Sequence, residues 1–323
     1  MKDFTNLIDL AAERTGGKTL KCTDDFFAPM ENLLKPGRGI FIEDKYTDHG
    51  KWMDGWESRR KRTAGHDWVV IKLGLRGVIA GVDIDTNHFL GNHPPFASMD
   101  AACVNGTPSD SDWHEVLTKS PLQPGSQNLY HIKSDKEWTH VRLHIYPDGG
   151  VARLKVYGEV KPDWAQVSKE DVIDLIAVEN GGRALSCNDM FFSHKDNLIM
   201  PNRGANMGDG WETKRNRTPN NYDWVILKLG HVGVANRIEV DTCHFKGNYP
   251  DRCSIESIDA ADIDDDELNN LTWQMLLPET KLSADKQHFF EKELLHHNTI
   301  SHIRLKIFPD GGISRVRLNG SIA

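Results

Sequence analysis

Short apolar runs rich in β-branched and aromatic residues recur along the chain, and apart from two short N-terminal segments no stretch has helical periodicity. Residues 68–74 and 224–230 are two such runs, and each ends in glycine. Residues 82–86 and 238–242 instead alternate apolar and acidic side chains, so that one face of each strand would point inward. The pattern predicts buried strands of antiparallel β-sandwiches.

A Pro-Asp-Gly-Gly sequence separates two apolar runs near the end of each half of the chain. Residues 147–150 separate residues 141–146 from 151–158, and residues 303–320 repeat the arrangement. Proline presets a turn, aspartate bonds its own backbone and glycine accepts a positive φ. We expect each half to end in a β-hairpin.

The two halves are copies of one unit. Asp9 and Asp174 lie in matching segments, and 174 minus 9 gives an offset of 165. At Trp56 and Trp211 the offset is 211 minus 56, or 155, so the first copy has ten extra residues between Gly39 and Asp54. The extra segment, residues 40–53, is either a lid over a site or a surface loop without function.

A length of 323 residues is enough for two separate cores. Together with the duplication, this length predicts two domains, residues 1–162 and 163–323. The strand patterns and the lack of sustained helical periodicity predict that each is an all-β antiparallel sandwich. The loops at the ends of such sandwiches commonly carry binding sites, while the sheets supply a rigid frame.

Composition narrows the classes of partner. The chain is 38% hydrophobic and 27% charged, and no apolar run approaches the roughly 20 residues of a membrane span. Its net charge of −8 is spread along the sequence, and no basic cluster alternates with aromatic residues. We therefore expect neither a membrane nor a nucleic acid as partner.

The cysteines and the chain start bear on location. The five cysteines include no C-x-x-C pair, and Cys22 and Cys187 occupy equivalent places, which favours small packing residues over disulfides or a zinc site. The first residues lack the pattern of a secretory signal. These features predict a cytoplasmic protein.

Carboxylate and imidazole side chains recur in both copies next to turns. Glu57 and Glu212 follow Asp-Gly-Trp, where each is either a general base or part of an ion pair. His88 and His244 follow an acidic strand end, where an imidazole either transfers protons or bonds structurally within its loop. Duplication alone does not separate these interpretations.

Other residues are candidates for binding. Arg142 and Arg304 lie on a polar strand face, where a guanidinium either grips a carboxylate or remains a surface charge. Trp56 and Trp211 either stack on a flat ligand or, more in keeping with a sandwich, fill the end of its core. Histidines cluster near residue 296 without the spacing of a zinc motif, so no metal or other cofactor is assigned.

Four motifs give the chain a family resemblance: residues 51–60, residues 65–68, residues 85–92 and the two Pro-Asp-Gly-Gly turns. With them the sequence resembles allantoicase (allantoate amidinohydrolase) over nearly its whole length. The resemblance implies two tandem jelly-roll domains similar to galactose-binding sandwiches. It also implies hydrolysis of allantoate to ureidoglycolate and urea in purine breakdown, and is compatible with a homo-oligomer.

Under that resemblance we expect Glu57 and His88 to share the proton transfers that expel urea and deliver water. Candidate groups for binding the substrate carboxylate are Arg59, Arg60 and Arg142, and those for a ureido group are Asp85 and Asn92. Counterparts in the second copy, which form either a second site or a surface facing another subunit, are Glu212, Asp241, His244, Asn248 and Arg304.

The two copies differ in two other respects: Tyr222 stands where the first copy has His66, and the second copy lacks the extra segment. Two other interpretations remain open. One is a non-enzymatic tandem sandwich that binds a carbohydrate or small ligand. The other is an enzyme in which one copy serves only structure or oligomerisation.

Overall fold

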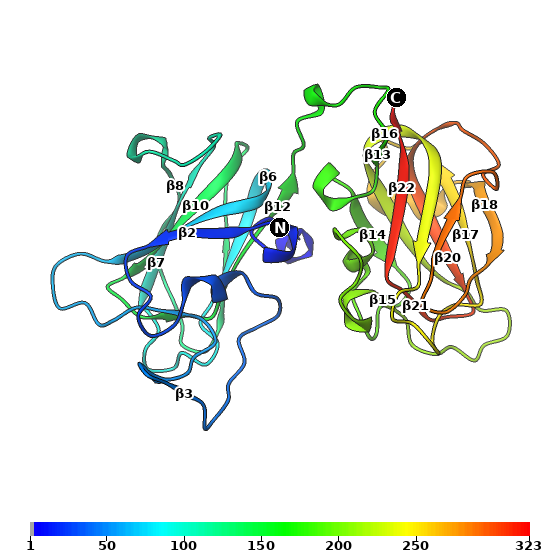
Figure 1. Ribbon diagram of the computed structural model, residues 1–323. Helices are drawn as coiled ribbons and strands as arrows, with labels where there is room; N and C mark the ends of the chain where they lie inside the picture. The colour runs from blue at the N-terminus through cyan, green and yellow to red at the C-terminus, as the bar shows by residue number, and fades with distance from the viewer. Residues whose placement is uncertain (1–2) are drawn as a thin grey trace. The chain divides into compact units, whose positions relative to one another are not determined.

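The computed structural model describes residues 3–323, whose regular secondary structure consists of β-strands and a few short 3-10 helices (Figure 1). It divides into two compact units, Met1–Lys161 and Pro162–Ala323. The all-β prediction is confirmed. Within residues 3–323, no helix has the length and apolar character that crossing a membrane requires.

The strands of the first unit are β1 (Ile8–Asp9), β2 (Lys18–Cys22), β3 (Tyr46–Thr47), β4 (Gly50–Lys51), β5 (Trp56–Glu57), β6 (Asp67–Asp85), β7 (Phe96–Ala102), β8 (His114–Pro121), β9 (Gln127–His131), β10 (Glu137–Tyr146), β11 (Gly150–Val151) and β12 (Arg153–Val160). Its short 3-10 helices are η1 (Phe4–Asn6), η2 (Glu13–Thr15), η3 (Met30–Leu34) and η4 (Asp110–Asp112).

The strands of the second unit are β13 (Ile173–Asp174), β14 (Arg183–Cys187), β15 (Trp211–Glu212), β16 (Asp223–Asp241), β17 (Arg252–Ile258), β18 (Gln274–Lys281), β19 (Gln287–Phe290), β20 (Thr299–Phe308), β21 (Gly312–Ile313) and β22 (Arg315–Ile322). Its 3-10 helices are η5 (Trp164–Gln166), η6 (Val178–Asn180), η7 (Lys195–Ile199), η8 (Met207–Asp209) and η9 (Asp265–Asn270). Strands β3 and β4 lie in the extra segment, residues 40–53, and the described part of the second unit has no equivalent of this pair.

The long strand β6 takes part in both layers of the first unit. Its first residues pair with β2 and β10, whereas residues 77–85 pair with β12 and residues 81–85 with β9. The sequence pattern predicts two separate strands here, but one 19-residue strand runs through both. Gly74 and Gly77 lie where it passes between layers, and a Cβ at Gly77 would sit 2.2 Å from the Glu159 carbonyl oxygen. Close backbone approach therefore requires glycine at this point.

The expected terminal hairpins are wrong in both units. β10 and β12 do not pair with each other; both pair with β6, and the Pro-Asp-Gly-Gly segment carries the chain between them. The same holds for β20 and β22 around β16. The Pro-Asp-Gly-Gly turn therefore connects two strands that do not pair with each other. The short strand β11, which begins at the end of this turn, pairs with β5.

Both repeated tryptophans belong to the core. Trp56 and Trp211 are fully buried, and each indole nitrogen donates a hydrogen bond of 2.8 Å to a backbone oxygen, that of Asp24 or Asp189. The interpretation of these residues as core is confirmed. All five cysteines are free, and Cys22 and its counterpart are half-buried.

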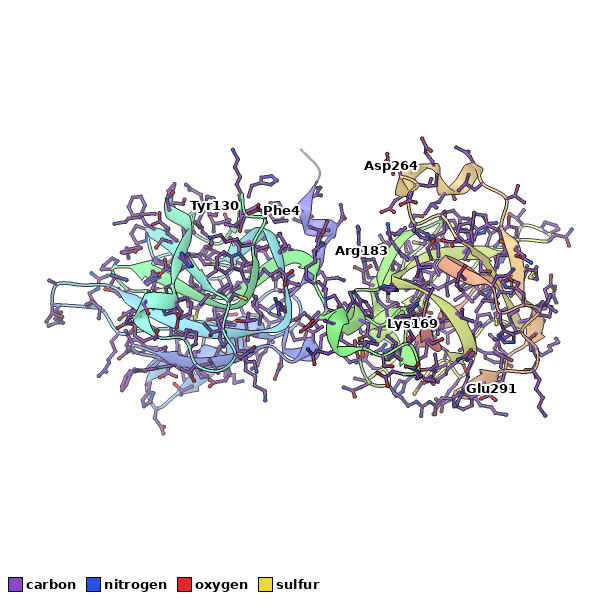
Figure 2. The ribbon with its side chains drawn as sticks, turned by 90° about the horizontal axis from the view of Figure 1, so that it is seen from above. Phe4, Tyr130, Lys169, Arg183, Asp264 and Glu291 are labelled. Atoms are coloured by element: carbon purple, nitrogen blue, oxygen red, sulfur yellow. The ribbon has the colours of Figure 1, made fainter. Side chains whose placement is uncertain are left out.

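The first strand is held to β12 through the carboxylate of Asp9. Its Oδ1 accepts hydrogen bonds from the backbone nitrogens of Ala11 (3.1 Å) and Val156 (3.0 Å). Nearby, the Phe4 ring, labelled in Figure 2, packs edge-on against His131 with centroids 4.7 Å apart. Burial raises the pKa of Asp9 to about 6.

Replacing Asp9 by asparagine is expected to stabilise the protein on the order of 1–2 kcal/mol at pH 7. The amide oxygen can keep both backbone bonds without the cost of a buried charge. Because the pKa in the folded state, about 6, lies above the ordinary value of 3.8, wild-type stability falls as pH rises between these values. Urea unfolding at pH 4 and pH 7 measures the effect, and a gain of equal size at both pH values would contradict it.

Candidate active site

The first unit has a cavity of about 460 Å³ that is walled by the extra segment and by two neighbouring turns. Its lining residues are Phe27, Phe41, His49, Gly50, Lys51, Met53, Glu57, His88, Leu90, Gly91 and Asn92. The volume suits a small organic molecule. Three of the candidate residues, Glu57, His88 and Asn92, therefore share one cavity.

Glu57 is fixed in place from several directions. It lies in β5, where its backbone nitrogen donates to the Ala28 oxygen (3.0 Å) and its backbone oxygen accepts from Phe27 and Ala28. Its Oε1 accepts a 2.7 Å hydrogen bond from the Asn92 amide. Burial raises the pKa of the Glu57 carboxyl, and the Asn92 bond partly offsets that rise. A carboxylate made more basic in this way is suited to accept a proton.

His88 occupies a turn with a backbone φ of 68°, a conformation uncommon for residues other than glycine. His244, its counterpart, has a φ of 70°, and its Nε2 bonds to the Gly204 oxygen at 2.8 Å. In the first unit the Asn87 amide makes the equivalent bond, 2.7 Å to the Gly39 oxygen. Among residues 3–323 the His88 ring then has no hydrogen-bond partner, and it remains available to a ligand.

The extra segment forms one wall of the cavity, as expected if it is a lid. The Phe41 ring lies over His88, with centroids 5.6 Å apart. The Lys51 ammonium lies 4.6 Å from the centroid of the Phe41 ring, and the His49 Nδ1 lies 2.6 Å from the Phe26 oxygen. Lys51 therefore contributes a positive charge to the cavity lining.

The second unit keeps only part of this arrangement. Glu212 and Asn248 are again hydrogen-bonded to each other, but the bond from His244 to Gly204 occupies the imidazole. A short turn ending in η8 replaces the extra segment, so no counterparts of Phe41 and Lys51 are present in the described part of this unit. The two copies are chemically unequal.

The aspartates expected to bind a ureido group lie under the turns instead. Asp85 is buried, receives a two-pronged bond from Arg38 (2.7 and 2.8 Å) and accepts from the Asn87 backbone nitrogen (2.9 Å). Asp241 has the same arrangement with Arg203. These carboxylates are already paired, and they hold the histidine turns in shape.

The candidate arginines are placed away from the cavity lining. The Arg59 Nε donates a hydrogen bond of 2.7 Å to the Asp24 Oδ2. Arg60 is exposed at the domain surface. Arg142 bonds Asp100 (2.8 Å) and lies over Trp113. The second unit repeats the latter pattern, since Arg304 bonds Glu256 and lies over Trp273.

Sequence reasoning missed Lys51, Phe41 and Asn87. The signal for the first two was present, because the extra segment occurs in one copy alone, but nothing in the sequence shows which of its side chains turn inward. Asn87 differs from Cys243 at the equivalent position, and only the structure shows that this difference releases His88. Among residues 3–323, no group of three or more His, Cys, Asp or Glu side chains is placed to hold a metal ion.

Comparison with known proteins is consistent across sequence and structure. A family model described as Allantoicase repeat matches residues 8–161 and again residues 173–323. A relative named probable allantoicase 1, from Burkholderia mallei, is 50% identical over 99% of this chain and 96% of its own length. A probable allantoicase of Photobacterium profundum is 50% identical over 98% of this chain and 97% of its own.

A solved structure has a closely similar fold. The crystal structure of allantoicase from Saccharomyces cerevisiae is 37% identical in sequence and has a TM-score of 0.83. The match covers 97% of this chain and 92% of that one. The likeness extends over both repeats, so it includes the unit with the cavity and the unit without the extra segment.

Proposed function

The chain belongs to the allantoicase family and hydrolyses allantoate to ureidoglycolate and urea, and we propose that the reaction takes place in the cavity of the first repeat. The observation that carries the proposal is the difference between repeats at His88. Its imidazole is unbonded within the described residues and faces the cavity that also holds Glu57, whereas the second repeat ties its histidine to the backbone.

Binding of the substrate follows from the polar groups of the cavity. Allantoate carries one carboxylate and two planar ureido groups on a single carbon. Lys51 supplies the positive charge for the carboxylate, in place of the arginines expected from the sequence. The Asn92 amide, which already positions Glu57, presents its oxygen to ureido N–H groups, and the Phe41 side chain adds an apolar wall beside them.

Two proton transfers complete the reaction. Expelling urea breaks a C–N bond, and the leaving nitrogen must receive a proton, which His88 gives in its protonated form as it becomes a neutral imidazole. The remaining ureido nitrogen lends its electron pair to the carbon as the bond breaks. Glu57 then takes a proton from water as the water oxygen bonds to that carbon, giving ureidoglycolate. Each such transfer contributes typically about 10²–10⁴ in rate.

Urea release from allantoate by the purified full-length protein is the direct test of the activity. The carbohydrate-binding alternative predicts binding without urea release and is not favoured by the full-length match to allantoicases. The location in the first repeat is tested separately by variants of the two repeats. Loss of activity on changing the second repeat alone would place the reaction there.

Replacing Lys51 by methionine is expected to raise KM for allantoate about 10- to 100-fold, because a charge-assisted hydrogen bond contributes roughly 1.5–3 kcal/mol. We expect kcat to change less, since Lys51 contacts the carboxylate and not the breaking bond. Lys51→Arg should recover much of the loss. Steady-state kinetics measures both constants, and an unchanged KM in Lys51→Met would remove this residue from the site.

A further inference from the structure

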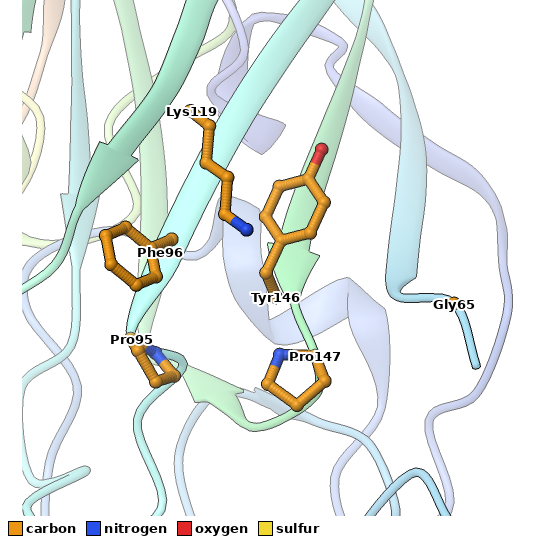
Figure 3. Close-up of a pocket in the computed structure, with 6 residues that line it drawn as sticks. All are labelled: Gly65, Pro95, Phe96, Lys119, Tyr146 and Pro147. Carbon is orange, nitrogen blue, oxygen red and sulfur yellow. The ribbon is translucent and has the colours of Figure 1, made fainter. Parts of the chain in front are cut away.

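A second cavity in the first repeat, of about 290 Å³, has no role in the function proposed above. Its lining residues are Gly65, Pro95, Phe96, Lys119, Tyr146 and Pro147 (Figure 3). The Lys119 ammonium lies 4.4 Å from the centroid of the Tyr146 ring and 5.1 Å from that of Phe96. Figure 3 shows the amine directed between these two rings. The cavity thus combines flat apolar walls with a single cation.

A chain of hydrogen bonds lies beside this cavity and joins side chains of β7, β10 and the residue before β6. Asp100 Oδ2 bonds both Arg142 (2.8 Å) and the His144 Nε2 (2.9 Å), and the His144 Nδ1 lies 2.9 Å from the His66 Nε2. The His66 ring in turn contacts the Tyr146 ring, with centroids 4.5 Å apart. Three titratable groups are therefore connected in series up to the edge of the cavity.

The donor and acceptor roles along these hydrogen bonds are set by Asp100. The hydrogen bonds from His144 and Arg142 lower the pKa of Asp100, which therefore accepts only. Neutral His144 must then donate from Nε2 and accept at Nδ1, so that His66 donates from Nε2. Its Nδ1, which has no hydrogen-bond partner among residues 3–323, is left as an acceptor.

The second repeat shows that the fold does not require these residues. There Glu279 replaces Lys119 and Arg252 replaces Phe96, and the two form an ion pair of 2.6 Å. Lys306 replaces His144 and bonds Glu256 at 2.7 Å. The same frame is thus stable with its charges paired. In the described part of the first repeat, Lys119 has no carboxylate within ion-pair distance.

The geometry points to a second ligand site in the first repeat, one that binds a small carboxylate whose planar group carries an N–H or O–H donor. Lys119 holds the carboxylate, the rings of Phe96 and Tyr146 cover the planar group of the ligand, and His66 Nδ1 accepts from its donor. Ureido acids belong to this class. That the reaction product, ureidoglycolate, is one such ligand rests on the proposed function. The site itself rests only on the contacts described above.

Calorimetric titration with hydantoate, the ureido derivative of glycine, tests this site. The full chain carrying Lys51→Met is used, so that binding at the first cavity is weakened. We expect saturable binding that Lys119→Met weakens about 10- to 100-fold, as loss of a charge-assisted bond does. Lys133→Met, which removes another exposed lysine, is the matched control and should leave the affinity unchanged.

A second pair of measurements tests the role of the imidazole. His66→Tyr places the second repeat's residue in the first and is therefore expected to fold, as a thermal melt would show. It should weaken hydantoate about tenfold and leave benzoate, which has no N–H donor, unaffected. Absent binding, or binding equally tight in Lys119→Met, overturns the proposal. Urea release by the wild-type chain is a separate readout, so failure here leaves the proposed function standing.

Discussion

Glu57→Gln lowers kcat for allantoate by about 10²–10⁴, the largest effect we expect from any single substitution. The amide has the same shape as the carboxylate, and its oxygen can still accept from the Asn92 side chain, a bond of 2.7 Å in the wild type. What is lost is the ability to take a proton from water. Steady-state kinetics with urea detection measures the change.

The pH profile provides a second measurement on the same residue. A general base must be ionised, so kcat/KM falls as pH drops through the pKa of Glu57, which burial places above the ordinary value of 4.5. Glu212→Gln is the matched control, because it alters the equivalent carboxylate in the repeat that lacks the extra segment. Equal losses in the two variants would contradict a single working site in the first repeat.

His88→Asn is expected to have the second largest effect, a loss of about 10²-fold in kcat. Asparagine tolerates a positive φ better than most residues, so the turn at φ 68° is kept while the proton donor is removed. The KM for allantoate should change little, since Lys51 and Asn92 remain. A thermal melt shows whether the fold is intact.

The control for His88 is again its counterpart. His244→Asn removes the bond to the Gly204 oxygen, 2.8 Å from Nε2 in the wild type, and should cost stability with little change in kcat. Wild-type kcat in His88→Asn would exclude this imidazole from catalysis. Loss of rate in His244→Asn at full stability would show that the second repeat works as well.

Much of the fold follows from the sequence. Alternating and apolar runs identified strands, and the matching segments identified two units of the same design. The pairing of the strands did not follow, because the partner of a strand depends on contacts distant in the sequence. β10 and β12 are separated by a turn typical of hairpins, yet each gains more by pairing with the long β6 than with the other.

The candidate site was predicted in outline. Glu57, His88 and Asn92 lie together, as expected from their motifs, because a strand end and the turn after β6 meet at one cavity. The binding groups were less predictable. Arginines and aspartates attract each other wherever the fold brings them close, so Asp85 and Arg142 are neutralised by partners that no local pattern reveals. That Lys51 instead lines the cavity is visible only in three dimensions.

Because β6 passes through both layers of the first unit, the two layers are expected to open together. If the backbone hydrogen bonds between residues 77–85 and β12 break, the displaced strand is the same one that pairs with β2 and β10. Sub-global opening, which usually follows the boundaries between separately bonded segments, has no such boundary here. Amide protons on both layers should therefore exchange through a single cooperative event, with the extra segment, residues 40–53, exchanging first.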